Sequence, residues 1–200
     1  MRVAVLLSGG GRSFENLVEC SRRGEIGSQV VLAISSSRTA GGLERARRLS
    51  VPSLVVEGRG PELAGAVFAA LDEARVDLAC LAGWIKLLAP IPPAWKGRVL
   101  NIHPALLPSF AGKGFWGDKV HEAVLAAGVK VTGCTVHFCD DEYDHGPIVL
   151  QRTCPVLDDD DAHTLAGRVF EEEKKAYPEA VRLFEQGRLK IEGRRVRVLR

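Results

Sequence analysis

Short apolar runs alternate with amphipathic segments along the first half of the chain. The apolar runs have the length and composition of strands and lie at residues 3–7, 30–34, 53–56, 78–82 and 99–102. The segments between them carry apolar side chains at helical spacing and lie at residues 14–20, 43–49 and 61–73. Strands that alternate with helices predict a mainly parallel, twisted sheet with helices on both faces.

The second half has a different pattern, in which strands follow one another before a long helix. Helices are predicted at residues 118–127 and 162–186, and strands at 133–138, 148–151 and 154–156. The acidic residues 158–161 precede the long helix and offer capping side chains. Near the end of the chain apolar residues alternate with basic ones, which predicts a solvated final strand. Together these elements suit one α/β domain over residues 1–200.

Composition and charge argue against several classes of function. Hydrophobic residues make up 46% and charged residues 26% of the chain, and the net charge of +2 disfavours a surface dedicated to nucleic acid or membrane. The five cysteines lack Cys-x-x-Cys spacing, so we expect reduced thiols in a cytoplasmic protein. No signal peptide and no membrane-spanning run is recognisable. The histidines show no metal-ligand spacing, so no metal is expected.

Candidate chemistry lies where the strand at residues 99–102 runs out. Asn101 and His103 are two residues apart on an extended backbone, so their side chains point to the same face, and Pro104 ends the strand. An amide can stabilise an oxyanion and an imidazole can move a proton, which suits acyl transfer. A loop asparagine beside a capping histidine is the alternative, and these residues alone leave both interpretations open.

A glycine-rich turn at residues 9–11 follows the first strand. A dinucleotide fingerprint needs a sixth-position glycine, where this chain has Phe14, and the Walker pattern is absent too. A glycine turn that opens a helix still presents free N–H groups to one phosphate, and Arg12 and Ser13 add a cation and a hydroxyl. We therefore favour a phosphomonoester site over a mere tight turn, with Ser13 as the cap of the following helix.

An acidic loop at residues 139–147 separates two predicted strands. Asp144 precedes a tight His-Gly-Pro exit, where a rigid carboxylate can reach an imidazole and stabilise its protonated form. From the residues alone, the acids at 140–142 are interpreted as a solvated turn. His137 alternates with core residues and is interpreted as a satisfied buried histidine rather than a catalytic one.

Three motifs together resemble the folate-dependent formyltransferases. They are Leu-Asn-Ile-His-Pro-Ala-Leu-Leu-Pro at 100–108, Gly-Cys-Thr-Val-His-Phe at 133–138 and Asp-x-Gly-Pro at 144–147, and the similarity covers nearly the whole chain. It is strongest to the members that formylate glycinamide ribonucleotide in purine synthesis. The resemblance implies a Rossmann-like sheet with its site at the carboxyl edge. It also implies 10-formyltetrahydrofolate as co-substrate and direct attack by the amine through a tetrahedral intermediate.

The resemblance also implies roles for individual residues. The catalytic residues would be Asn101, His103 and Asp144. The residues holding the ribonucleotide would be Gly10, Gly11, Arg12, Ser13 and Glu173. The residues holding the folate would be Lys86, Leu87, Leu88, Asn101, Cys139, Asp140, Asp141, Glu142 and Tyr143. Residues 1–100 would bind the ribonucleotide phosphate and residues 101–200 would carry catalysis and folate binding. The segment 111–119 is longer than the family's usual connection, and a lid beside the folate tail is one role open to it.

Three rival functions remain at this point. Formyltetrahydrofolate hydrolases share the catalytic trio but carry an N-terminal regulatory domain, which this sequence does not show. Methionyl-tRNA formyltransferases carry a C-terminal RNA-contacting domain, which is not recognisable either. A non-enzymatic nucleotide-binding module is disfavoured by the failed fingerprint. We expect small-molecule substrates, no nucleic acid or membrane partner, and a monomer or weak homodimer.

Overall fold

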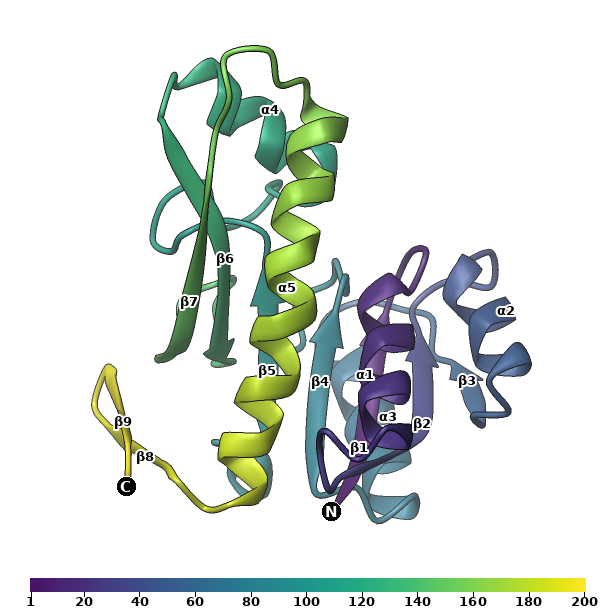
Figure 1. Ribbon diagram of the computed structural model, residues 1–200. Coiled ribbons are helices and arrows are strands. Elements are labelled where there is room, and N and C mark those ends of the chain that lie inside the picture. Colours follow the sequence, from purple (N-terminus) through teal and green to yellow (C-terminus); the bar gives the residue numbers. More distant parts are fainter.

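The computed structural model describes residues 1–200, in which nine strands form one sheet (Figure 1). The strand order is β3-β2-β1-β4-β5-β6-β7-β9-β8. The strands are β1 Arg2–Leu7, β2 Gln29–Ser35, β3 Ser53–Val55, β4 Leu78–Ala82, β5 Val99–His103, β6 Val131–Phe138, β7 Ile148–Pro155, β8 Leu189–Glu192 and β9 Arg195–Val198. The strands from β3 to β5 run parallel, whereas β6 is antiparallel to both β5 and β7, and β7 pairs in parallel with β9. The prediction of a Rossmann-like, mainly parallel sheet is confirmed.

Helices cover both faces of the sheet. They are α1 Arg12–Arg22, α2 Gly41–Arg48, α3 Gly60–Glu73, α4 Asp118–Ala126 and α5 Ala162–Glu185, with one 3-10 turn at Pro93–Trp95. Buried residues of α1, α2, α4 and α5 share one hydrophobic core, and those of α3 belong to a second core. In Figure 1, α1 and α5 lie side by side in front of the sheet and α3 lies behind it.

The central strand β1 shows why its sequence is a continuous apolar run. Val3, Val5 and Leu7 belong to the core under α1, whereas Ala4 and Leu6 belong to the core under α3. Successive side chains of a strand point to opposite faces, so a strand covered on both faces needs apolar residues at every position. The sheet therefore separates two cores and leaves only its edges and strand ends for polar chemistry.

The order of the strands reverses beside β1. The chain passes from β1 outward through β2 to β3, and then returns to place β4 and β5 on the other side of β1. In open α/β sheets, ligands bind beyond the carboxyl ends of the strands at such a reversal. The loops that leave β1 and β4 flank this point, and the end of β5 lies next to it.

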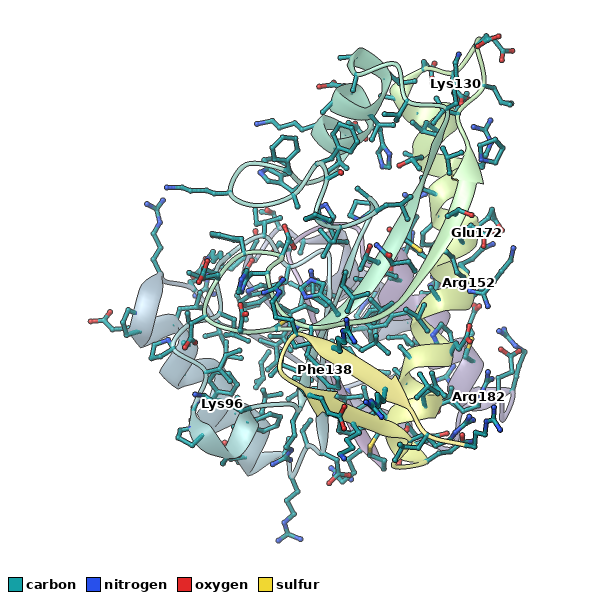
Figure 2. All side chains as sticks on the ribbon, turned by 90° about the vertical axis from the view of Figure 1, so that its left-hand side faces the viewer. Lys96, Lys130, Phe138, Arg152, Glu172 and Arg182 are labelled. Carbon is teal, nitrogen blue, oxygen red and sulfur yellow. The ribbon has the colours of Figure 1, made fainter.

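The long helix α5 is fixed at several places along its length. Asp161 accepts a hydrogen bond from the backbone N–H of Thr164, 2.7 Å away, so the acidic approach to this helix supplies its cap as predicted. Arg152 of β7 lies between α5 and the sheet, 2.6 Å from Oε2 of Glu179 and 3.9 Å from Oε2 of Glu172 (Figure 2). These contacts hold α5 against β7 along the middle of the helix.

One local prediction is wrong, and one element was missed. Ser13 does not cap the first helix, because α1 begins at Arg12 with Gly11 at the N-cap position and no side-chain cap. Gly11 has φ 76°, and a Cβ there would lie 2.7 Å from the Cα atom of Gly42, so the turn requires glycine. The predicted solvated final strand is β9, and the sequence pattern missed β8, which pairs with it in a hairpin.

Candidate active site

A cavity of about 660 Å³ opens at the carboxyl edge of the sheet, within the size range of small-molecule sites. Its wall is formed by the loops that follow β1, β4 and β5, by the segment before α4 and by one side of α5. The residues that line it include Gly10, Arg12, Ser13, Trp84, Ile85, Asn101, His103, His121, Tyr143, Asp144, Phe170 and Glu173. The cavity therefore lies where the strand order predicts a ligand.

Asn101 and His103 both line this cavity, as the strand geometry predicted. The Nδ2 group of Asn101 lies 3.2 Å from Oδ1 of Asp144 and 3.0 Å from Nε2 of His137. One amide nitrogen carries two protons, so both of its donors have partners in this structure. The side chain is consequently held in one orientation before any ligand arrives.

His103 is buried, and its protonation state follows from its contacts. Its Nε2 lies 2.8 Å from the carbonyl oxygen of Phe110, and because a carbonyl only accepts, Nε2 carries the proton. Its Nδ1 is therefore the basic nitrogen, and it lies 3.6 Å from Oδ2 of Asp144. Burial lowers the pKa of His103, and the negative charge of Asp144 and the Phe110 carbonyl offset only part of that effect. The ring is therefore neutral at pH 7, and its basic nitrogen, Nδ1, faces the carboxylate of Asp144.

Asp144 is the centre to which the other polar groups converge. Its backbone has φ 51°, a left-handed conformation that an aspartate adopts at some energetic cost. Its Oδ2 also accepts a hydrogen bond from the backbone N–H of Gly112, at 2.9 Å. Burial raises the pKa of Asp144, but the neighbouring rings of His137 and His103 and the N–H of Gly112 outweigh burial and hold that pKa below its usual value. Asp144 is thus an anion inside the cavity.

His137 belongs to this group, although the sequence pattern gave it no catalytic place. It is buried as predicted, and its Nδ1 lies 2.8 Å from the carbonyl oxygen of Phe138. Nδ1 is therefore the protonated nitrogen, and Nε2 accepts the hydrogen bond from Asn101. His137 stands opposite Asn101 in the antiparallel ladder of β5 and β6. Knowledge of the pairing register between β5 and β6 would have placed His137 beside Asn101.

The glycine loop and α5 form another wall of the cavity. Gly10, Arg12 and Ser13 line it, and Gly11 lies behind them at the start of α1. The guanidinium of Arg12 lies 4.3 Å from the ring centroid of Phe170, within the range of a cation–π contact. The first backbone N–H groups of α1 and this cation give the wall a positive character.

Glu173 is the acid of this wall. The hydroxyl of Ser13 donates to its Oε2 at 3.3 Å, so the serine that does not cap α1 contacts α5 instead. Burial raises the pKa of Glu173 to about 7, against the smaller lowering effects of Ser13 and Arg12. Residues from both halves of the chain thus form the proposed ribonucleotide end of the cavity.

The residues expected to hold folate lie mostly beside the cavity rather than on its wall. Tyr143 lines it, whereas the segments 86–88 and 139–142 do not. The ammonium of Lys86 donates to the carbonyl oxygen of Ser36 at 3.1 Å. Asp141 accepts a hydrogen bond from the backbone N–H of Ile91 at 2.7 Å, which ties the two segments to each other. The acids of this loop are therefore not simply solvated, because Asp141 fastens it to the chain that follows β4.

The comparisons with known proteins identify the family. The sequence pattern described as formyl transferase matches residues 1–181. The chain belongs to the formyl transferase family. Among solved structures, this formyl transferase is similar to glycinamide ribonucleotide transformylase 1 from Symbiobacterium toebii, at 42% identity and a TM-score of 0.91, over 100% of this chain and 94% of that one.

Sequence relatives of this formyl transferase include two eukaryotic proteins. The trifunctional purine biosynthetic protein adenosine-3 of Gallus gallus is 40% identical over 96% of this chain, which spans only 19% of that protein. The chloroplastic phosphoribosylglycinamide formyltransferase of Arabidopsis thaliana is also 40% identical, over 94% of this chain and 67% of the relative. The chain therefore corresponds to one part of the larger relatives.

Two further findings concern metal binding and membrane-spanning helices. No group of three or more His, Cys, Asp or Glu side chains in the structure has the arrangement of a metal site. None of its helices is long and apolar enough to cross a membrane.

Proposed function

We propose that this protein transfers the formyl group of 10-formyltetrahydrofolate to the amine of glycinamide ribonucleotide in de novo purine synthesis, as a phosphoribosylglycinamide formyltransferase. The observation that carries the proposal is the meeting of Asn101, His103 and Asp144 in one cavity with the glycine loop at the start of α1. The names of the Arabidopsis and Symbiobacterium relatives support glycinamide ribonucleotide as the acceptor of the formyl group.

The ribonucleotide occupies the end of the cavity next to α1 and α5. Its phosphate receives hydrogen bonds from the backbone around Gly10 and Gly11 and charge from Arg12. Ser13 and Glu173 contact the sugar part, because they face each other on the same wall. This placement directs the glycinamide amine away from the glycine loop and toward His103.

The folate occupies the other side, where the segments 86–88 and 139–143 lie. Asp141 holds these two segments together through Ile91, so they form one continuous surface beside the cavity. Tyr143 belongs to both that surface and the cavity wall. The pterin lies against this surface. The formyl group, which is attached to N10 beyond the pterin, reaches Asn101.

The reaction begins when the amine nitrogen attacks the formyl carbon. The carbonyl electron pair moves to oxygen. The resulting oxyanion accepts a hydrogen bond from Asn101 Nδ2, whose N–H turns to it from Asp144. Such a donor typically contributes about 10²- to 10³-fold to the rate. His137 accepts a hydrogen bond from the other N–H of the amide, and this contact keeps the Asn101 donor directed at the oxyanion.

The proton of the attacking amine then moves to the folate. Nδ1 of His103 takes it, because Nδ1 is the basic nitrogen of the neutral ring. The carboxylate of Asp144, 3.6 Å away, stabilises the imidazolium that forms. As the bond between the formyl carbon and N10 breaks, N10 receives the proton, which gives tetrahydrofolate and the formylated ribonucleotide. The formyl carrier is the folate itself.

The proposal assigns a different task to each half of the chain. Residues 1–100 supply the phosphate loop, and residues 101–200 supply catalysis and most of the folate contacts, with Glu173 reaching across to the ribonucleotide. The partners are small molecules only, and the protein acts in the cytoplasm as a monomer or weak homodimer. Sedimentation at assay concentrations tests the oligomeric state.

Identification of the reaction product tests the proposed function. Purified protein is incubated with glycinamide ribonucleotide and 10-formyltetrahydrofolate labelled with carbon-13 in the formyl group. The proposal predicts that mass spectrometry finds the label in the ribonucleotide, in amounts equal to the tetrahydrofolate formed. Label recovered as free formate would contradict the proposal and indicate a hydrolase.

A further inference from the structure

The glycine loop contacts α2 on the side that faces away from the cavity. The backbone N–H of Gly42, at the start of α2, donates to the carbonyl oxygen of Gly9 at 3.0 Å. Nε of Arg45, three residues later on the same helix, donates to the carbonyl oxygen of Gly10 at 2.7 Å. No residue of α2 lines the cavity, whereas Gly9 and Gly10 do. Two successive carbonyl groups of the loop are therefore tied to a helix behind it.

These two contacts decide the direction of the N–H groups of the loop. The peptide bonds from Gly9 to Gly11 are trans, and in a trans peptide the C=O and the N–H point in opposite directions. Because the carbonyl of Gly9 points at α2, the N–H of Gly10 points away from that helix. The N–H of Gly11 points away for the same reason, since the carbonyl of Gly10 is held by Arg45. Neither N–H has a hydrogen-bond partner within the protein, so both are available to a ligand.

The backbone angles at the end of the loop suit an anion. Gly11 has φ 76° and ψ 28°, which is a left-handed conformation, and Arg12 is the first residue of the right-handed helix α1. A left-handed residue next to a right-handed one directs successive N–H groups to one point, an arrangement that binds anions. Arg45 holds the peptide plane that enters this arrangement, so it controls the first of the converging N–H groups.

The guanidinium of Arg45 is itself held by α1. Its Nη1 contacts one carboxylate oxygen of Glu15, and Nη2 of Arg48 contacts the other. The side chains of Arg45 and Glu15 are only 33% and 19% exposed, so this pair is partly shielded from solvent. The charge of Arg45 is thus paired on the side away from the loop, and the hydrogen bond from Nε is what it contributes to Gly10.

We infer that Arg45 is a positioning residue for the phosphate end of the cavity. It orients the peptide between Gly10 and Gly11 so that the N–H of Gly11 meets the phosphate, and it acts through the backbone without touching the substrate. The inference rests on the proposed function and deepens it, because it names the side chain that arranges the loop before the ribonucleotide arrives. A loop that is already arranged loses less conformational freedom on binding, which raises the affinity.

Two substitutions separate the hydrogen bond of Arg45 from its charge. The amide nitrogen of glutamine is as many bonds from Cα as Nε of arginine, so Arg45→Gln keeps a donor for Gly10 and removes the charge. Arg45→Met has a similar length and removes both. The Gln variant should bind glycinamide ribonucleotide within about twofold of the wild type, and the Met variant about tenfold more weakly. An equal tenfold loss in both variants would assign the effect to charge and overturn the inference.

A pair of ligands shows whether the phosphate is the group affected. Titration calorimetry in the absence of folate compares glycinamide ribonucleotide with glycinamide riboside, which lacks only the phosphate. Arg45→Met should weaken binding of the ribonucleotide and leave binding of the riboside unchanged. An equal loss for both ligands would indicate general damage to the cavity and overturn the inference. If Arg45→Met does not fold, Arg45→Ala, which also lacks the donor and favours the helix, takes its place.

Arg48 provides the matched control. It lies on the same helix and pairs with the same carboxylate of Glu15, but its hydrogen bond goes to Glu15 and not to the glycine loop. Arg48→Met should therefore leave the affinity for the ribonucleotide unchanged. A loss equal to that of Arg45→Met would assign the effect to the contact between α1 and α2, and it would overturn the role of the Gly10 carbonyl.

Steady-state kinetics separate this inference from the proposed function. Arg45→Met should raise the KM for the ribonucleotide about tenfold and leave the KM for 10-formyltetrahydrofolate unaltered. If the wild type prefers the ribonucleotide to the riboside, and Arg45→Met loses that preference, but no formyl group is transferred, the proposed function is refuted and the positioning role stands. If formyl transfer occurs and Arg45→Met keeps the full preference for the phosphate, the proposed function stands and the positioning role is refuted.

Discussion

The Nδ1 atom of His103 lies 3.6 Å from Oδ2 of Asp144, and Nε2 of the same ring is engaged by the Phe110 carbonyl. The ring is thereby oriented with its basic nitrogen toward the carboxylate. Burial disfavours the imidazolium, and Asp144 favours it. The pair therefore holds a base that is neutral at rest and able to accept one proton during the reaction.

Removal of the Asp144 charge should lower the pKa of His103 further and slow turnover. The variant Asp144→Asn keeps the shape of the side chain, so the loss reports the charge. Because residues that act as one unit give non-additive losses, the variant His103→Ala/Asp144→Asn should be hardly slower than the slower single variant. Turnover of all four proteins, with folic acid binding as the folding control, provides the cycle. Losses that multiply would refute the partnership.

Replacement of His137 should impair catalysis without weakening ribonucleotide binding. Its Nε2 accepts a hydrogen bond from the side-chain amide of Asn101. The variant His137→Ala removes that acceptor and frees the amide to rotate. We expect kcat to fall by about tenfold, less than the 10²- to 10³-fold expected for Asn101→Ala. His137→Gln can replace the acceptor and should recover part of the rate. A change in the ribonucleotide KM alone would place His137 in substrate binding instead.

Removal of the Arg12 cation should affect only one substrate. Arg12→Ala is expected to raise the KM for glycinamide ribonucleotide by about tenfold or more, because it removes a charge from the phosphate end of the cavity. The KM for 10-formyltetrahydrofolate should stay nearly constant. Arg47→Ala is the matched control, since Arg47 is exposed on α2 and pairs with Glu44. Unchanged ribonucleotide kinetics in the Arg12 variant would exclude the contact.

The half-buried carboxyl of Glu173 should make the stability of the protein depend on pH. Its pKa is raised from 4.5 to about 7 in the folded state, so the folded protein binds more protons than the unfolded chain between these values. Stability is therefore lost as the pH rises through this window. The Tm of Glu173→Gln should nearly equal that of the wild type near about pH 4 and exceed it near about pH 8.

The control for Glu173 lies on the same helix. Glu171 is exposed and pairs with Lys174, so Glu171→Gln should leave the difference in Tm between the two pH values unchanged. If Glu173→Gln gains no stability at the higher pH, the pKa of Glu173 is not raised in the folded protein.

The fold was predictable because its determinants are local. The apolar runs that became β1 to β5 and the helical spacing between them are properties of short segments, and Asn101 and His103 follow from the period of one strand. The contacts of His137 depend on the register between β5 and β6, which no local pattern specifies. The place of Ser13 against Glu173 depends in the same way on the packing of α1 on α5.

Dependence of folate turnover on the amine acceptor tests the central claim most directly. The protein is incubated with 10-formyltetrahydrofolate, with and without glycinamide ribonucleotide, and the formation of tetrahydrofolate is followed by absorbance. The account predicts rapid formation only when the ribonucleotide is present, and its loss in Asn101→Ala and His103→Ala. Rapid deformylation without the ribonucleotide, at a rate that its addition does not change, would contradict the account.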